Sequence, residues 1–177
     1  MIKNYSHTPL EIPVSYTVFQ NPTGLTGLVT SSEGLIRLIN KLADENAIEK
    51  HLTQLTNGNI SKKPSHFKDL IKQFSLYFDG KLKKFDHPLD LRLGTPFQQK
   101  VWKKLLTIPH GKTHSYKWLA QAIKNPQASR AVGNANGKNP LSIIIPCHRV
   151  VKGNGEMGGY TGGVSIKRFL LKLEQAI

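Results

Sequence analysis

SYKWLAQAIKNPQASRAVGNANG, residues 115–137, determines the architecture expected for the C-terminal half of this 177-residue chain. Ser115 can cap a first helix through Ile123, and Asn125-Pro126 begins a second helix from Gln127 to about Gly137. Two short helices joined by a tight turn have the layout of a helix-turn-helix, although any helical hairpin gives a similar pattern.

The second of these helices has a surface of small residues around one large side chain, Arg130. The small residues are Ala128, Ser129, Ala131, Gly133 and Ala135. Because small side chains let a helix backbone approach its neighbour closely, they indicate a contact surface for a partner. A tightly packed Ala/Gly helix crossing inside the protein is the alternative interpretation.

A third helix is predicted upstream, where Thr95 can cap it, Pro96 fits its first position and Gln98 can complete a capping box. Gly94 just before it marks the expected domain boundary. We therefore expect two domains, residues 1–93 and residues 94–177, of which the second is mainly α-helical.

The N-terminal half predicts an α/β domain. Three short β-prone pieces, separated by turn signals, indicate a small antiparallel sheet; they are Pro13–Phe19, Leu25–Thr30 and Gly34–Ile39. Residues 65–78 place apolar side chains at helical spacing, residues 41–55 are polar and ambiguous, and Leu89–Leu93 reads as a further strand.

Charge is distributed unevenly between the two halves. Residues 1–90 carry 11 basic and 9 acidic side chains, whereas residues 91–177 carry 14 basic and 2 acidic ones, a net charge of +12. Such a field concentrates polyanions, and the phosphate backbone of nucleic acid is the commonest polyanion in cells. The pattern favours nucleic-acid binding over attraction to a membrane surface.

Cys147 is the only cysteine, which excludes an internal disulfide and a cysteine-rich zinc site, so no metal is expected. No segment has the length of apolar sequence that a membrane helix requires, and the N-terminus does not resemble a signal peptide. These observations predict a cytoplasmic protein, or a nuclear one in a eukaryotic host, with no membrane contact.

The apolar residues Ile143–Pro146 predict a short buried strand that leads into Cys147 and His148. A nearby imidazole can take the proton of a thiol or stabilise its thiolate. In an extended segment neighbouring side chains point to opposite faces, so His148 would reach the sulfur through a water molecule. Of the two acids in this half, Glu174 is the better placed to orient the imidazole. A buried structural Cys and His remain the alternative.

The string Pro146-Cys-His-Arg-Val150 resembles the signature of the O6-alkylguanine-DNA alkyltransferases, and further motifs match at the family's spacing. These are Ser115-Tyr116, Ser129–Gly133, Asn139-Pro140, Gly158–Gly163 and Glu174. The resemblance is strong over residues 88–176 and general before them, where it implies a ribonuclease-H-like domain. Some relatives carry a proline that lines the pocket at the position of Ser142. This difference affects how well the site would accept bulky adducts such as benzyl.

The resemblance implies a role for each matching residue. Cys147 would accept the alkyl group, activated by His148, a bound water and Glu174, while Asn139 would hold the turn beside it. Arg130 would fill the gap that remains in the duplex when the damaged nucleotide is rotated out. The helix around Ala128, Ser129, Ala131 and Gly133 would enter the minor groove. Tyr116 would contact the DNA backbone and donate a proton, while Tyr160, Thr161, Val150 and Gly158 would form the base pocket.

The function implied is direct repair of double-stranded DNA by a cofactor-free monomer. One alkyl group would pass irreversibly from flipped O6-alkylguanine, or more weakly O4-alkylthymine, to each Cys147. The alternatives are a non-catalytic alkyltransferase-like lesion-binding protein, a helix-turn-helix regulator and a cysteine hydrolase. Lesion-binding proteins of the alkyltransferase-like type lack the acceptor cysteine, and a helix-turn-helix regulator does not need one. A cysteine hydrolase would turn over repeatedly.

Overall fold

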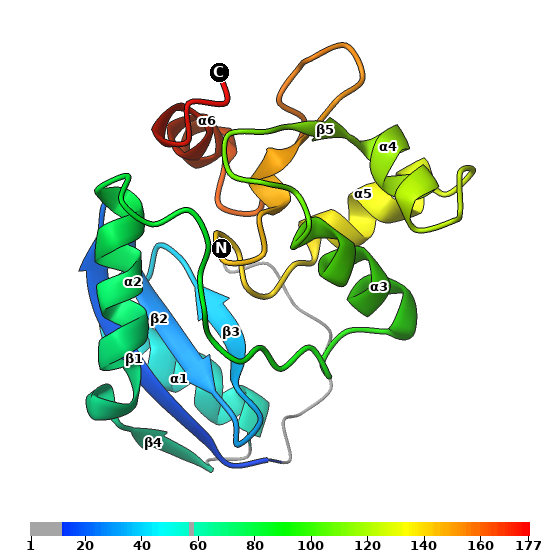
Figure 1. Ribbon diagram of the computed structural model, residues 1–177. Helices are drawn as coiled ribbons and strands as arrows, with labels where there is room; N and C mark the ends of the chain where they lie inside the picture. The colour runs from blue at the N-terminus through cyan, green and yellow to red at the C-terminus, as the bar shows by residue number, and fades with distance from the viewer. Residues whose placement is uncertain (1–11, 57–58) are drawn as a thin grey trace. The chain divides into compact units, whose positions relative to one another are not determined.

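The computed structural model describes residues 12–56 and 59–177, which form two compact units (Figure 1). The N-terminal unit runs to Asp79 and includes Asp86–Leu93; the C-terminal unit contains Gly80–Phe85 and Gly94–Ile177. No helix in the described ranges is both long enough and apolar enough to cross a membrane. The extreme N-terminus, for which we expected no signal peptide, lies largely outside these ranges.

A four-stranded sheet forms the centre of the N-terminal unit, in the order β3-β2-β1-β4. Its strands are β1 (Val14–Asn21), β2 (Gly24–Thr30), β3 (Leu35–Ile39) and β4 (Ile60–Lys62). The first three pair antiparallel as predicted, but β4 pairs parallel to β1, so the sheet is mixed. Sequence patterns missed β4 because three residues are too short to show an alternation.

Helices cover both faces of this sheet (Figure 1). The ambiguous polar segment forms α1 (Asn46–Thr56), which buries Ile48 and Leu52 against the sheet because its apolar residues recur every three to four positions. On the other face lies α2 (Lys68–Phe78), preceded by the 3-10 turn η1 (Pro64–Phe67). Phe74 of α2 packs on Phe19 of β1 with ring centroids 5.2 Å apart.

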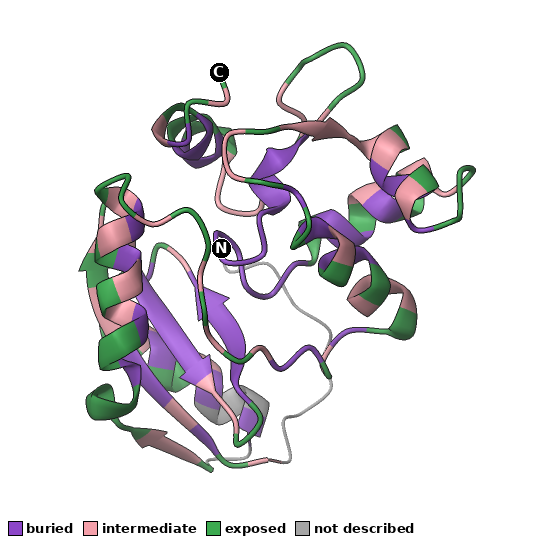
Figure 2. Ribbon diagram, in the orientation of Figure 1, coloured by how far each residue is buried: buried purple, intermediate pink, exposed green. Residues whose placement is uncertain are grey.

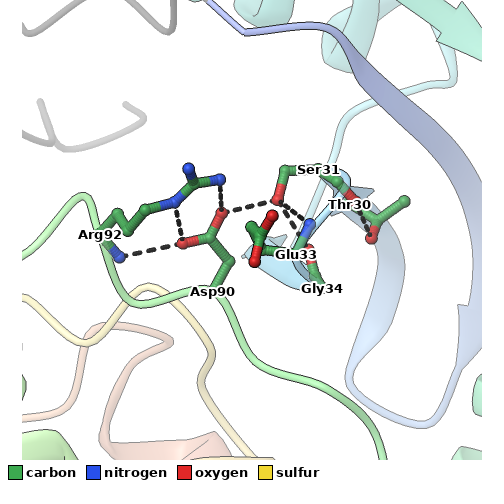
Figure 3. A network of polar contacts seen from close by, with 6 residues as sticks. All are labelled: Thr30, Ser31, Glu33, Gly34, Asp90 and Arg92. Carbon is green, nitrogen blue, oxygen red and sulfur yellow. Dashed lines mark hydrogen bonds and ion pairs between the residues drawn. The ribbon is translucent and has the colours of Figure 1, made fainter.

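The predicted strand Leu89–Leu93 is wrong: only Leu89 makes a bridge, parallel to Leu35. A polar network fixes this segment instead (Figure 3). The buried Asp90 carboxylate accepts a 2.6 Å hydrogen bond from Ser31 Oγ and two side-chain bonds from Arg92. The chain turns here so that the buried carboxylate is hydrogen-bonded, and the regular backbone hydrogen bonds of a strand are not formed.

The C-terminal unit is mainly helical and begins with α3 (Pro96–Leu105), where the predicted capping box at Thr95 and Gln98 is present. The predicted pair of short helices is also confirmed. It consists of α4 (Tyr116–Ala122), capped by Ser115, and α5 (Ser129–Gly137). The C-terminal helix is α6 (Val164–Leu173). As Figure 2 shows, these helices alternate buried and exposed positions, as amphipathic helices do.

The buried strand predicted at Ile143–Pro146 is wrong, although Ile143 and Ile145 are buried. The Asn139 side chain accepts from the Leu141 backbone at 2.9 Å and donates to the Ile145 carbonyl at 2.8 Å, which holds a compact loop. Apolar composition alone does not distinguish such a loop from a strand. The chain continues into the 3-10 turn η2 (Cys147–Arg149) and β6 (Val150–Val151), which pairs parallel to β5 (His114–Ser115).

Candidate active site

The Cys147 side chain is almost fully buried, at 1% exposure, and its sulfur accepts a 3.0 Å hydrogen bond from Asn139 Nδ2. Its backbone carbonyl accepts a 3.3 Å bond from Asn136 Nδ2. The two asparagines therefore hold the cysteine from its side chain and from its backbone. The predicted neighbour Asn139 is in place, whereas Asn136 carried no sequence signal beyond its small-residue surroundings.

The pKa of the Cys147 thiol is raised to about 11 because burial disfavours the thiolate. The hydrogen bond from Asn139 and the positive charge of Lys167 oppose this shift but do not overcome it. The cysteine is therefore a neutral thiol near pH 7. To act as a nucleophile it must pass its proton to a base.

His148, Arg149 and Glu174 form one buried network. His148 Nε2 lies 2.9 Å from Glu174 Oε1, and Arg149 donates from Nε and Nη2 to the same carboxylate at 2.8 and 2.9 Å. Arg149 also donates to the Ile108 carbonyl at 2.6 Å. The expected pairing of His148 with Glu174 is direct, and Arg149 is a third member that sequence reasoning did not assign.

Electrostatics define the protonation of this network. Burial would raise the pKa of Glu174, but hydrogen bonds from His148 and Arg149 lower it well below its usual range. Burial lowers the pKa of His148, so the imidazole is neutral near pH 7 despite the carboxylate. Its Nε2 then donates to Glu174, which leaves the buried Nδ1 as an acceptor that no described residue engages.

Lys167 of α6 is a fully buried amine beside the cysteine, and no sequence motif pointed to it. Its Nζ donates to the Val150 carbonyl at 2.5 Å and to the Met157 carbonyl. Burial lowers the pKa of Lys167 to about 8, and the negative charge that Cys147 carries as a thiolate opposes this shift. The amine ties the segment that follows the cysteine to the loop before Gly158. A lysine on an otherwise apolar helix face was the available signal.

Tyr116 is half-buried at the start of α4 and lies against Gly158. A Cβ added to Gly158, whose φ is +65°, would stand 3.0 Å from the Tyr116 hydroxyl oxygen. Burial, followed by the negative charge that Cys147 carries as a thiolate, raises the pKa of Tyr116, so the phenol keeps its proton. The structure thus places Tyr116 against Gly158 and near Cys147.

The other residues assigned to the pocket lie in the same part of the C-terminal unit. The Tyr160 ring meets His148 edge-on, with centroids 6.4 Å apart, and Val150 is buried directly after η2. Thr161 Oγ1 donates to the Gly137 carbonyl at the end of α5 with a 2.7 Å bond. This contact joins the Gly158–Gly163 segment to α5.

The residues assigned to DNA contact lie at the beginning of α5. Arg130 and Ala131 are exposed, while Ala128, Ser129 and Gly133 are partly exposed. Among the described residues no carboxylate pairs with Arg130. The arginine is therefore available at the surface, separate from the buried network. Chemically, the site offers a protonated thiol, a neutral imidazole oriented by a carboxylate, and a phenol.

Comparisons with known proteins identify similar chains and structures. A family model for the DNA-binding domain of 6-O-methylguanine DNA methyltransferase matches residues 96–176. The methylated-DNA–protein-cysteine methyltransferase of Methanosarcina acetivorans is 43% identical over 159 residues, which is 90% of this chain and 97% of the relative. That of Mycobacterium bovis is 54% identical over 113 residues, which is 64% of this chain and 68% of the relative.

Solved structures extend the similarity to the N-terminal unit. The crystal structure of Mycobacterium tuberculosis OGT in complex with DNA has a TM-score of 0.79 and 42% sequence identity, covering 92% of this chain and 93% of that one. The O6-methylguanine-DNA methyltransferase of Pyrococcus kodakaraensis has a TM-score of 0.64 and 27% identity, covering 91% and 98%. The similarity therefore includes the mixed sheet as well as the helical unit.

Proposed function

The chain belongs to the O6-methylguanine DNA methyltransferase family, and we propose that Cys147 is the residue that accepts the alkyl group in its reaction. The protein transfers an alkyl group from O6-methylguanine in DNA to a cysteine. Cys147 is the only cysteine of the sequence, and the observation that carries the assignment is its buried thiol within the Asn139 and His148 cluster.

Proton removal from Cys147 is assigned to His148. The neutral imidazole has a buried Nδ1 that can accept, and Glu174 holds the ring by its Nε2. A bound water would carry the proton from the thiol to Nδ1. The imidazolium formed is stabilised by the ionised carboxylate, so charge separation in the buried site is offset locally. Asn139 stabilises the developing thiolate through its 3.0 Å bond to the sulfur.

The transfer itself is a displacement at the alkyl carbon. The bond from the Cys147 sulfur to this carbon forms while the bond from carbon to O6 breaks, and its electron pair passes into the guanine ring. Tyr116 would donate a proton toward that ring, a role consistent with a phenol whose raised pKa keeps it protonated. The thioether product is inert, so each protein molecule would react once and need no cofactor.

Proteins of this family bind DNA, and α5 is the helix that we assign to the contact with the duplex. A base inside a duplex shields O6 from in-line attack, so the nucleotide must be flipped out of the stack. The exposed Arg130 side chain would occupy the gap, while Ala128, Ser129, Ala131 and Gly133 would let α5 approach the minor groove of double-stranded DNA. A monomer is sufficient for this arrangement, because all assigned residues come from one unit.

The flipped base would lie beside the Gly158–Gly163 segment. Tyr160 and Gly158 would shape this pocket, and the Thr161 amide and the carbonyls of Cys147 and Val150 would contact the base edge. Side chains already hold both carbonyls, the first through Asn136 and the second through Lys167. A carbonyl oxygen has two lone pairs, so each can still accept from a base.

Intact-protein mass spectrometry after mixing with a duplex containing O6-methylguanine tests this function. We expect one methyl group per molecule, located on Cys147 by peptide mapping, and none on Cys147→Ala, which should still bind the duplex. A mass gain in Cys147→Ala would contradict the acceptor assignment. No gain in the unaltered protein would support a lesion-binding protein or a regulator, and turnover beyond one equivalent would support a hydrolase.

A further inference from the structure

Asn136, in the last turn of α5, has one polar atom paired and one unpaired. Its side chain is 3% exposed, and its Nδ2 donates to the Cys147 carbonyl. Since that carbonyl oxygen can only accept, the amide must present its nitrogen there and its oxygen elsewhere. The oxygen, Oδ1, is buried and accepts no hydrogen bond from the described residues.

The neighbouring Asn139 shows what a fully hydrogen-bonded asparagine looks like in this site. Its oxygen accepts from the Leu141 backbone, and its nitrogen donates to the Ile145 carbonyl and to the Cys147 sulfur. Buried acceptors in folded proteins are nearly always paired, because an unpaired one loses its hydration without compensation. The unpaired oxygen of Asn136 therefore points to a hydrogen-bond donor that arrives with the substrate.

Asn136 lies where the substrate base is expected. On one side it contacts the backbone of the nucleophile, Cys147. On the other, its chain neighbour Gly137 accepts the hydrogen bond from Thr161, in the segment assigned to the base pocket. A base between Cys147 and this segment would bring its edge next to the Asn136 amide.

The chemistry of the lesion identifies the donor. Alkylation at O6 removes the proton from N1 of guanine, so the 2-amino group is the only N–H donor left on the base. O4-alkylthymine has no N–H donor, because its N3 has lost its proton in the same way. An acceptor oxygen in the pocket therefore distinguishes the two lesions by the amino group alone.

We propose that Asn136 is a specificity-determining residue, whose side-chain oxygen accepts a hydrogen bond from the 2-amino group of the flipped O6-alkylguanine. This inference rests on the proposed function. The amino group has two hydrogens, so one can be shared between the Cys147 and Val150 carbonyls as a bifurcated bond while the other is donated to Asn136. Asn136 thus orients the base against the nucleophile and disfavours bases that lack the amino group.

The test compares single-turnover transfer rates on two duplexes, one with O6-methylguanine and one with O6-methylhypoxanthine, which lacks only the amino group. The variant Asn136→Leu keeps a similar volume and removes both polar atoms. We expect it to slow transfer from O6-methylguanine about tenfold more than transfer from O6-methylhypoxanthine, because both substrates lose the support of the Cys147 carbonyl but only O6-methylguanine loses the hydrogen bond to its amino group. The ratio between the two substrates should therefore fall about tenfold.

Asn134→Leu is the matched control, since it changes the same residue type at an exposed position of the same helix and should keep the original ratio. If Asn136 only supports the Cys147 carbonyl, Asn136→Leu slows both substrates equally, and that result overturns the proposal. Should the leucine variant fail to fold, Asn136→Ala gives the same comparison. Equal rates on both duplexes with the unaltered protein also overturn it, whereas absence of transfer from O6-methylguanine overturns the proposed function instead.

Discussion

Glu174 is the residue on which the buried polar network depends, because His148 and Arg149 both donate to it. Glu174→Gln leaves a buried guanidinium without its counter-charge, so the free energy of unfolding should fall by about 3 kcal/mol near pH 7. Denaturant unfolding measures this change. Glu156→Gln is the control, since Glu156 pairs with Lys152 at the exposed surface and should have little effect.

The same carboxylate predicts a pH dependence with a definite sign. The pKa of Glu174 is lower in the folded protein than in the unfolded chain, so its contribution to stability is present above the unfolded pKa. This contribution is lost progressively as the pH falls below about 4.5. Glu174→Gln should therefore flatten the acid limb of the stability profile, and an unchanged slope would show that other groups control it.

Helix α5 combines two tasks, because it presents Arg130 at its exposed beginning and Asn136 at its buried end. If Arg130 fills the gap in the duplex, Arg130→Ala should reduce the single-turnover rate on duplex DNA at least tenfold while leaving the thiol environment intact. Arg168→Ala removes the same charge from an exposed position on α6 and should have a much smaller effect. Equal effects of the two variants would indicate that Arg130 contributes only a general contact to phosphate and does not fill the gap in the duplex.

The loop after β6 contains a glycine on which the position of Tyr116 depends. Gly158→Ala places a side chain at positive φ, at a penalty of about 1 kcal/mol, and also against the tyrosine hydroxyl. Gly155→Ala introduces a similar backbone strain at φ +84° with open space around it. Transfer rates should fall more for Gly158→Ala than for Gly155→Ala, while both variants lose similar stability. Equal rates would argue against a precise position for the phenol.

Local signals in the sequence predicted the elements that depend on local interactions. The capping box of α3 and the Ser115 cap of α4 are formed by neighbouring residues, so the sequence alone contains their determinants. The pairing of β4 with β1 and of β5 with β6 joins distant segments, and no pattern within two or three residues encodes it.

Site residues divide in the same way. The Pro146–Val150 motif pointed to Cys147 and His148 because the family resemblance is concentrated there. Lys167 and Asn136 were missed because their partners are backbone carbonyls, which every residue possesses and no motif can mark. Arg149 lay inside the motif, but its bonds to Glu174 and to the Ile108 carbonyl depend on how α6 packs.

At the scale of the entire chain, the basic charge that would attract DNA and the buried groups that would carry out the reaction are different sets of residues. The net charge of +12 lies in residues 91–177, while the reacting groups are buried within the same half. Affinity for a duplex should therefore fall steeply with added salt as phosphate contacts release counterions, and titrations at several salt concentrations measure the slope. The transfer rate at saturating protein should change much less. A flat affinity would contradict binding through the basic half.

The two-residue pairing of β5 with β6 has a mechanical consequence. Ser115 caps α4 and pairs with Val151, while His114 pairs with Val150, three residues after the nucleophile. The ladder therefore joins the first residue of the helix-turn-helix to the backbone that follows the sulfur. A displacement of α4 on DNA binding would also displace the segment that carries Cys147, so the position of the nucleophile would depend on how the duplex is seated.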